Sequence, residues 1–600
     1  MLKSRRTSRR SRDCPWLTDI PGVAMNLPPV PDGVTGRPDL VRVNPRHTLE
    51  NDTTCPDQRR AAVRPLIGPL DPVPFLTGPL QEFGTNPLQA CLDLVEFEGR
   101  ALLDTIEHLR ASKGVLQRWW SPAHPAHLQW TEQVVERYVA ARAAEQSAAQ
   151  ASGLPSTEAV AGHWVFRTEL SQAVDARGVR QYEHTIPGRR YESADGRLRD
   201  LWLTSMGRAR ENRPDNEKAA IAQVMALGGV GPKPRFAKAS SPRPSTADNP
   251  PQRVRVFDFG CADGSYRKIL DWDAAECRRR FGQHAAPAFA RAASSTGARP
   301  GGACVECKAI TGCDALPRTP DLWGGRPTVP PRPRRSLSAW DLRLYGQCPA
   351  QYHLTRRLHV ASLQPEGDGA RRGRAVDAWL NEAHTLRHPR GCRNVPGPEN
   401  PEDWSAGSHH VEGDLARQGA AMLRQHQALC PLDRLGSEEQ VLGQERVTVY
   451  VPELDVVVIS VPDLLFTRAG GWVWRETKTE AKPLWEGTPL MTRYPQLALG
   501  VLLLASGAKG ADPSRSWVEL ELLHAFDATL ERLDPGRPSV VEEARAVIAE
   551  LARPLLNDTE YAPRTGHHCL GCEARPWCVP GTAFAADHPD DTPRQEAMHV

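Results

Sequence analysis

The chain has 600 residues, of which 24% are charged, and its formal net charge is +3. This length allows two to four domains with ample core. The near-neutral charge excludes a globally basic protein, so any nucleic-acid contact must be local. No apolar run approaches the ~20 residues of a membrane helix, and no apolar segment follows the basic N-terminus. We therefore expect a cytoplasmic protein without a membrane segment, whose cysteines are thiols or metal ligands rather than disulfides.

Composition divides the chain into five stretches. Residues 1–80, rich in proline and arginine, and residues 583–600 are predicted to be disordered tails. Residues 81–316 are interpreted as an α+β module, and residues 317–335 as a proline-rich linker. Residues 336–582 carry the remaining helix and strand patterns and are interpreted as a second domain.

In the N-terminal module, apolar periodicity predicts helices first, then strands, then one more helix. The predicted helices cover residues 88–116, 128–149 and 274–294, and the predicted strands cover 163–170, 180–191, 197–206 and 253–259.

The second domain is predicted to begin with a short helix that Ser338 caps. A long polar loop is expected over residues 388–414. The remaining predicted helices cover 372–386, about 415–428, 494–504 and 540–556, and a strand is predicted over 517–526.

A two-stranded ribbon lies at the centre of this domain. Residues 455–466 form a β-branched apolar run interrupted by Pro462-Asp463, and residues 472–477 alternate aromatic with polar side chains. Ala469-Gly470-Gly471 between them supplies a tight turn. The sequence therefore predicts a β-hairpin here.

Charged side chains gather on this ribbon. Because strand side chains alternate, Glu476 and Lys478 point to one side and Thr477 to the other. Asp463 is expected close by, near the end of the first strand. Such a cluster is costly to bury unpaired, so it usually has a metal ion or phosphate to neutralise it. The alternative is a hairpin with a surface salt bridge between Glu476 and Lys478.

Pro462-Asp463 followed by Glu476-Thr477-Lys478 resembles the active-site signature of the PD-(D/E)XK nuclease superfamily. The resemblance covers about residues 336–580 and implies an α/β fold in the C-terminal half. Its core would be restriction-endonuclease-like, a mixed sheet flanked by helices.

The resemblance also implies roles for these residues. Asp463 and Glu476 would hold Mg²⁺ or Mn²⁺, with the carbonyl of Thr477 as a further ligand. The ion would lower the pKa of a bound water. Lys478 would orient that water or stabilise charge on the phosphoryl oxygens.

A third metal ligand is expected on the preceding helix, where the superfamily usually has histidine. This chain has Asp377 at that position, in GRAVD. His384 lies seven residues further on, about 10.5 Å along the helix axis, so both cannot bind one ion. We favour Asp377; the alternative is an aspartate on a solvated helix face.

Gln496, in YPQLALG, resembles the glutamine of the Q-x-x-x-Y motif of RecB-like nucleases, where it supports the site and DNA. Gly500 occupies the tyrosine position, and Tyr494 is the residue that could compensate.

Two copies of Cys-x2-Cys-x5-Cys are the most specific feature after the ribbon. In the C-terminal copy, Cys569, Cys572 and Cys578 have Cys348 as their distant partner. This layout resembles the iron–sulfur nucleases of the RecB-like branch, which includes AddB, and implies a structural 4Fe-4S cluster. Zinc is the alternative metal, because the neighbouring His567 and His568 are possible zinc ligands.

The N-terminal copy consists of Cys304, Cys307 and Cys313, and its fourth ligand is open between three cysteines. Cys261 is favoured, with Cys277 and Cys91 as alternatives. The remaining cysteines carry no pattern and are interpreted as ordinary thiols: Cys14, Cys55, Cys392 and Cys430.

These observations favour a metal-dependent DNA nuclease of the RecB-like exonuclease type, acting on single-stranded or free-ended DNA. The first alternative is a DNA-binding scaffold that has lost turnover. The second is an iron–sulfur or zinc module of a helicase–nuclease or defence complex. The chain has no Walker loop, so a helicase motor would have to be a partner.

Overall fold

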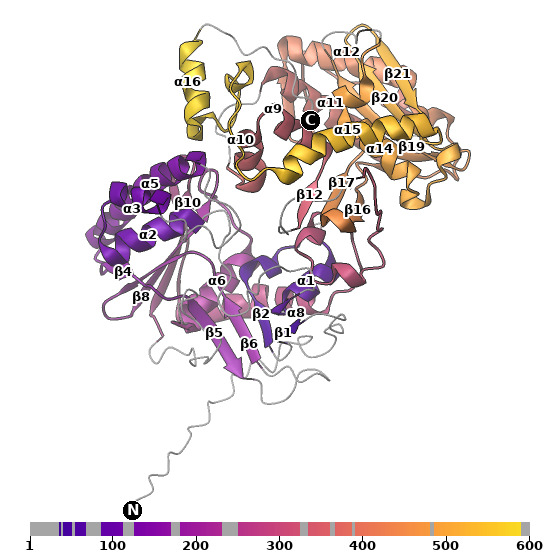
Figure 1. The fold of residues 1–600 in the computed structure, drawn as a ribbon. Helices are drawn as coiled ribbons and strands as arrows, with labels where there is room; N and C mark the ends of the chain where they lie inside the picture. The colour runs from indigo at the N-terminus through magenta and orange to yellow at the C-terminus, as the bar shows by residue number, and fades with distance from the viewer. Residues whose placement is uncertain are drawn as a thin grey trace, which may run out of the picture. The chain divides into compact units, whose positions relative to one another are not determined.

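A computed structural model describes most of the chain. The described residues are 35–37, 40–50, 54–67, 86–111, 125–169, 181–230, 250–324, 334–360, 367–386, 391–480, 485 and 487–589. By their contacts these residues divide into two compact units. The N-terminal unit comprises Met1–Phe83, Tyr138–Arg299 and Cys307–Gly312, and the C-terminal unit comprises Gly84–Arg137, Pro300–Glu306 and Cys313–Val600. Both units mix helices with strands, so the fold class is α/β (Figure 1).

The N-terminal unit contains two main sheets. One has the strand order β11-β10-β8-β7-β4 and the other the order β2-β6-β5-β9. Their strands are β2 (Leu40–Val43), β4 (Thr157–Ala159), β5 (Trp164–Glu169), β6 (Gln181–Thr185), β7 (Arg189–Ser193), β8 (Leu198–Ser205), β9 (Gly229–Val230), β10 (Arg253–Gly260) and β11 (Tyr266–Asp273).

One apolar core joins these sheets to the helices of the unit. Helix α6 (Asp215–Leu227) contributes a run of buried alanine, valine and methionine side chains to it. The segment predicted as one helix over 274–294 forms α7 (Ala274–Arg280), a π-helical turn and α8 (Ala286–Ser294). The predicted disorder up to residue 80 does not extend to the ordered elements between residues 40 and 67. These are β2, a 3-10 turn (Pro45–Thr48), α1 (Pro56–Ala62) and β3 (Leu66–Ile67), which pairs with β1 (Thr35–Gly36).

A five-stranded sheet organises the C-terminal unit, with the order β15-β18-β19-β20-β21. The pair β19–β20 is parallel and the other pairs are antiparallel. Its strands are β15 (Val441–Gly443), β18 (Leu464–Arg468), β19 (Gly471–Thr479), β20 (Trp517–Leu523) and β21 (Ala528–Leu533). Helix α14 (Pro495–Ala505) makes the crossover from β19 to β20 that a parallel pair requires.

Helices cover both faces of this sheet. On one face, α14 packs with α15 (Pro538–Asn557) and α9 (Ala339–Gln347) in the largest apolar core (Figure 1). On the other, α11 (Asp368–Leu386) and α12 (Gly413–Leu429) build a second core. The inner strands β18, β19 and β20 are therefore mostly buried, whereas the edge strands β15 and β21 are only partly covered.

The apolar run over 455–466 differs from the single strand that its composition predicts. It forms β17 (Val456–Ser460) and β18, separated at Val461–Asp463. Strand β17 pairs in a separate sheet, between β12 (Arg335–Leu337) and β16 (Val447–Val451). Pro462 has no N–H to donate to a ladder, so the chain changes sheets there.

The other helices of the C-terminal unit mostly match their predicted places. Ser338 caps α9 in a reciprocal capping box with Asp341. The polar loop expected over 388–414 is wrong in part, because a hairpin of β13 (Asp403–Ala406) and β14 (His409–Glu412) lies inside it. The remaining helices are α2 (Asn86–Glu98), α3 (Leu102–Ala111), α5 (Pro125–Ala151, shared with the N-terminal unit), α10 (Pro349–Tyr352), α13 (Leu490–Arg493) and α16 (Val579–Asp587).

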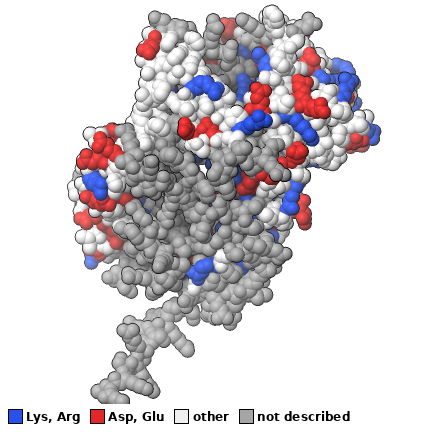
Figure 2. Space-filling model, viewed as in Figure 1, with Lys and Arg blue, Asp and Glu red and all other residues white. Residues whose placement is uncertain are grey.

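Surface charge and hydropathy agree with the composition. Lysine and arginine are interspersed with aspartate and glutamate over the described surface that Figure 2 shows. Among the helices that the structure describes, none has both the length and the apolar character needed to cross a bilayer.

The turn between β18 and β19 generates a stability prediction. Ala469 and Gly470 both have positive φ, which makes this a two-residue hairpin turn. A Cβ on Gly471 would overlap the carbonyl oxygen of Arg515. We therefore expect Gly471→Ala to lower the free energy of unfolding by about 1–3 kcal/mol, measured by urea denaturation. The control is Gly443→Ala on β15, where a Cβ meets nothing within 4 Å; equal effects of the two changes would contradict the prediction.

Candidate functional site

Strand β19 positions the charged ribbon residues. Trp474, Glu476 and Lys478 alternate along it with Arg475 and Thr477, which lie on the opposite face. The two-residue turn fixes the pairing of β19 with β18, so that Leu464 lies opposite Arg475. Asp463 immediately precedes β18 and is therefore next to the middle of β19.

The Lys478 ammonium lies between two carboxylates. Its Nζ is 3.4 Å from Asp463 Oδ2 and 3.4 Å from Glu476 Oε2. The side chains of Lys478 and Glu476 are 5% and 4% exposed, so this is a buried charge cluster and not the surface salt bridge considered from the sequence.

Both carboxylate oxygens of Asp463 accept hydrogen bonds. Oδ2 accepts a hydrogen bond from the backbone N–H of Thr477 at 2.6 Å. Oδ1 accepts one from Gln444 Nε2 at 3.3 Å, and the same amide donates to Asp377 Oδ1 at 3.3 Å. Gln444 thus joins Asp377 on α11 to Asp463, a contact that sequence reasoning missed because no motif contains this glutamine.

Glu476 is oriented by its own strand. Trp474 Nε1 donates to Glu476 Oε1 at 2.9 Å. A Cβ on Gly500 of α14 would lie 3.2 Å from three atoms of the Trp474 ring. The indole therefore fills the space over Gly500, the residue that stands at the tyrosine position of the Q-x-x-x-Y pattern considered from the sequence.

Burial and mutual repulsion change the proton affinities of the acids. Burial, and then the charge of Asp463, raise the pKa of Glu476 to about 7. The same two causes raise the pKa of Asp377 to about 7. Burial alone would lower the pKa of Lys478, but the carboxylates of Asp463 and Glu476 hold it above its ordinary value. Three acids around one ammonium leave excess negative charge, which favours a bound cation.

The donor set at this point suits a hard divalent cation. Asp377, Asp463 and Glu476 offer carboxylate oxygens, and the Thr477 carbonyl is a further oxygen donor, the ligand types that Mg²⁺ and Mn²⁺ prefer. The Lys478 ammonium balances part of their charge, and the neutral Gln444 amide donates hydrogen bonds to Asp377 and Asp463.

Gln496 and Tyr494 lie at the start of α14. Gln496 is half-buried in the first helical turn. Tyr494 is buried, and its hydroxyl donates to Glu480 Oε1 at 2.5 Å. Glu480 directly follows β19, so Tyr494 ties the helix to the end of the strand that carries Glu476 and Lys478.

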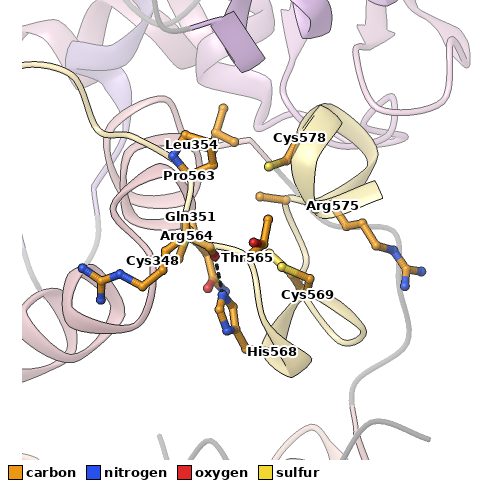
Figure 3. Close-up of a pocket in the computed structure, with 13 residues that line it drawn as sticks. Cys348, Gln351, Leu354, Pro563, Arg564, Thr565, His568, Cys569, Arg575 and Cys578 are labelled. Atoms are coloured by element: carbon orange, nitrogen blue, oxygen red, sulfur yellow. Dashed lines mark hydrogen bonds between the residues drawn. The ribbon is translucent and has the colours of Figure 1, made fainter. Parts of the chain in front are cut away.

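The four C-terminal cysteines line one pocket (Figure 3). Cys348 comes from the start of α10, and Cys569, Cys572 and Cys578 come from the loops before α16. A Cβ on Gly581 would lie 3.3 Å from Cys578 Sγ and 3.7 Å from Cys569 Sγ, so these two sulfurs face the same point. Burial raises the pKa of Cys572 to about 12, and nearby Cys348 adds to the shift.

Cys348 Sγ accepts a hydrogen bond from the backbone N–H of Arg564 at 3.4 Å. The same contact occurs in the N-terminal unit, where Cys55 Sγ accepts from the N–H of Arg299 at 3.4 Å. Arg564 lies five residues before Cys569, and Arg299 lies five residues before Cys304. Both cysteines also precede a proline that begins a helix. Cys55 had been interpreted as an ordinary thiol, and the Cys-Pro pair at 55–56 is the sequence signal that could have indicated this parallel.

The structure places the other cysteines considered for the N-terminal group in three different elements. Cys261 follows β10, Cys277 lies in α7 and Cys91 lies in α2, and all three are buried. Cys304 is buried, whereas Cys307 and Cys313 are partly exposed.

A further group was missed entirely from the sequence. His384, Cys392, His426 and Cys430 bring one ligand atom each to within 4.8 Å of one another, and all four are buried. Cys392 and Cys430 had been interpreted as ordinary thiols. The His426-x3-Cys430 spacing at the end of α12 is the signal that could have indicated them.

Part of the chain matches a known protein family. Residues 336–579 match the family profile of the PD-(D/E)XK nuclease superfamily. The matched segment contains the charged ribbon, Asp377, Gln496 and all four cysteines of the C-terminal pocket. A comparison with curated proteins finds no match.

The raised carboxyl pKa values generate a pH prediction. Unfolded carboxyls lose their protons near pH 4–4.5, whereas Glu476 and Asp377 keep theirs to about pH 7 in the fold. Between these values the folded state binds more protons, so its stability falls as pH rises. With divalent ions chelated, we expect the free energy of unfolding to fall from pH 5 to pH 7, by up to about 1.4 kcal/mol per pH unit for each carboxyl, and to level off above pH 7.

Glu476→Gln removes one of these titrations and should make the fall shallower, as measured by urea unfolding at several pH values. The control is Glu550→Gln, a change at an exposed glutamate of α15. A slope in Glu476→Gln as steep as in the wild type would contradict the prediction.

Proposed function

We propose that residues 336–579 form a metal-dependent DNA nuclease that hydrolyses phosphodiester bonds. The observation that carries this proposal is the buried convergence of Asp463, Glu476 and Lys478, with Lys478 Nζ 3.4 Å from both carboxylates. Buried charges at this density are costly, which supports a functional rather than a stabilising role.

The sheet topology supports a restriction-endonuclease-like core. Hairpin β18–β19 carries the charged residues, α14 crosses over, and β20 returns parallel to β19. Helix α11 brings Asp377 to the same end through Gln444.

The chemistry follows from the positions of the side chains. Bound Mg²⁺ or Mn²⁺ would supply charge neutralisation at the scissile phosphate and a water of lowered pKa. Asp463, Glu476, Asp377 and the Thr477 carbonyl would hold the ion. Lys478 keeps its proton at neutral pH, so its ammonium can stabilise the negative charge that develops on the phosphoryl oxygens. Trp474 keeps the Glu476 carboxylate oriented.

The substrate is proposed to be single-stranded or free-ended DNA, with cleavage of the RecB-like exonuclease type. The resemblance of the ribbon and of the cysteine layout supports this choice. Arg372 is a candidate phosphate contact on α11. It is buried beside Gln418, and burial lowers its pKa. A helicase motor would come from a partner chain.

A second candidate function is a DNA-binding scaffold without turnover, within a helicase–nuclease or defence complex. Aspartate at position 377 and glycine at position 500 favour it, because both depart from the pattern of the superfamily. Trp474 over Gly500 and Gln444 on Asp377 compensate for these departures, so we prefer the enzyme.

Cleavage of labelled single-stranded DNA with Mg²⁺ or Mn²⁺ tests this choice. We expect Asp463→Asn and Lys478→Ala each to reduce the rate by about 10²–10³-fold, because each removes a charge that acts on the transition state. Lys268→Ala, at an exposed lysine of β11, is the matched control and should cleave like the wild type. DNA binding without metal-stimulated cleavage by the wild type would favour the scaffold instead.

We further propose that Cys348, Cys569, Cys572 and Cys578 hold a 4Fe-4S cluster that joins the two ends of the domain. Four thiols lining one pocket suit an iron–sulfur cluster, with zinc as the alternative metal. His568 was the residue that suggested zinc as an alternative metal. Its Nε2 lies 2.9 Å from the carbonyl oxygen of Arg564 (Figure 3).

A similar cluster is proposed for Cys304, Cys307 and Cys313, with Cys261 as the fourth ligand favoured from the sequence. The contact between Cys55 and Arg299 supports Cys55 as a stronger candidate. Cys55 and Cys348 each accept a hydrogen bond from the arginine that lies five residues before the first cysteine of a triplet.

Iron analysis of anaerobically purified protein tests both clusters. We expect Cys569→Ser and Cys55→Ser each to remove about one four-iron cluster per chain, whereas Cys261→Ser retains the wild-type iron content. Loss of iron in Cys261→Ser but not in Cys55→Ser would restore Cys261 as the ligand. Unchanged iron in Cys569→Ser would overturn the C-terminal cluster.

A further inference from the structure

Two helices and two short turns converge on one buried point, away from the charged ribbon. His384 lies near the end of α11 and His426 near the end of α12. Cys392 lies in the 3-10 turn Gly391–Asn394, and Cys430 follows α12 directly. Each of the four side chains is at most 5% exposed.

The spacing of the ligand atoms suits one tetrahedral ion. His384 Nε2 lies 3.2 Å from His426 Nε2, and one ligand atom from each of the four residues lies within 4.8 Å of the others. Around zinc, ligand atoms at bond lengths of 2.0–2.3 Å lie roughly 3.3–3.8 Å from one another. The four atoms therefore need only small shifts to meet a common ion.

A buried carboxylate orients one of the imidazoles. His426 Nδ1 lies 2.9 Å from Glu521 Oε1, and both side chains are fully buried. A carboxylate on the second ring nitrogen is the usual support of a metal-bound histidine, because it leaves the first nitrogen free to face the ion. Cys430 Sγ is also held, by the backbone N–H of Cys392 at 3.5 Å.

We propose that His384, Cys392, His426 and Cys430 form a structural zinc site. Two thiolates and two imidazoles are a donor set that selects zinc. The site is closed on all sides by protein, so it leaves no open position for a substrate and is structural rather than catalytic. The proposal does not depend on the nuclease activity or on the iron–sulfur clusters.

The zinc site braces the strand that carries the charged ribbon. Glu521 Oε2 accepts a hydrogen bond from Thr477 Oγ1 at 3.2 Å. Thr477 lies between Glu476 and Lys478, on the opposite face of β19. His384 lies on the same helix as Asp377. The ion therefore fixes the ends of α11 and α12 against β20 and, through Glu521, the Thr477 side chain of β19.

The wild-type full chain provides the first test. Elemental analysis should find zinc at about one ion per chain, and zinc K-edge X-ray absorption should show two sulfur and two nitrogen neighbours at about 2.3 Å and 2.0–2.1 Å. Absence of zinc, an all-sulfur environment, or a disulfide between Cys392 and Cys430 in mass analysis would each overturn the proposal.

Reciprocal variants separate this site from the thiolate pockets. The double change Cys392→Ser/Cys430→Ser should lose the zinc and retain the iron, whereas Cys572→Ser should retain the zinc. Zinc retained by the double variant would overturn the assignment. If the double variant fails to fold, chelation of zinc from the wild type replaces it. Amide hydrogen exchange should then accelerate in β19 and β20 but not in β8 and β10; unchanged exchange in β19 and β20 would overturn the bracing role.

Discussion

The buried ammonium of Lys478 between two carboxylates is the constraint on which the C-terminal unit depends. Neither Glu476 nor Lys478 would be tolerated at this depth alone, because an unpaired charge costs several kcal/mol to bury. Their pairing requires that β19 keep its register, since a slip of one residue would move both side chains to the other face. The two-residue turn at Ala469-Gly470, the close approach of Gly471 to Arg515 and the N–H of Thr477 on Asp463 together hold that register.

Strand β19 carries charged side chains on both faces, and the charges are neutralised in a different way on each face. On the face toward α14, Asp463 and Glu476 share the Lys478 ammonium, and burial raises the pKa of Glu476 and of Asp377, which reaches the site from α11. On the opposite face, Arg475 pairs with Glu519 at 2.6 Å, and Thr477 bonds to Glu521. The second face is neutralised within the protein and supports the strand. The first retains excess negative charge, which suits a bound cation.

Two positions next to the charged ribbon, Gly500 and Asp377, are supported by neighbouring side chains. At Gly500, the indole of Trp474 packs over the glycine, and its Nε1 donates a hydrogen bond to Glu476. At Asp377, the Gln444 amide donates hydrogen bonds to both this carboxylate and that of Asp463. Both solutions use residues outside any motif, so they are visible only in three dimensions.

Local sequence determined the ribbon, the Ser338 cap, most helices and the two cysteine triplets, because each depends on neighbours within about ten residues. It also determined that Glu476 and Lys478 share a side, since alternation is a property of the strand itself. Only the tertiary structure decided that the run over 455–466 divides between two sheets, that Gln444 joins Asp377 to Asp463, and that Cys55 contacts Arg299. It likewise brought His384 to His426, 42 residues away in the chain. Such contacts depend on how helices pack across a sheet, and no short pattern in the sequence records which of many buried side chains will meet.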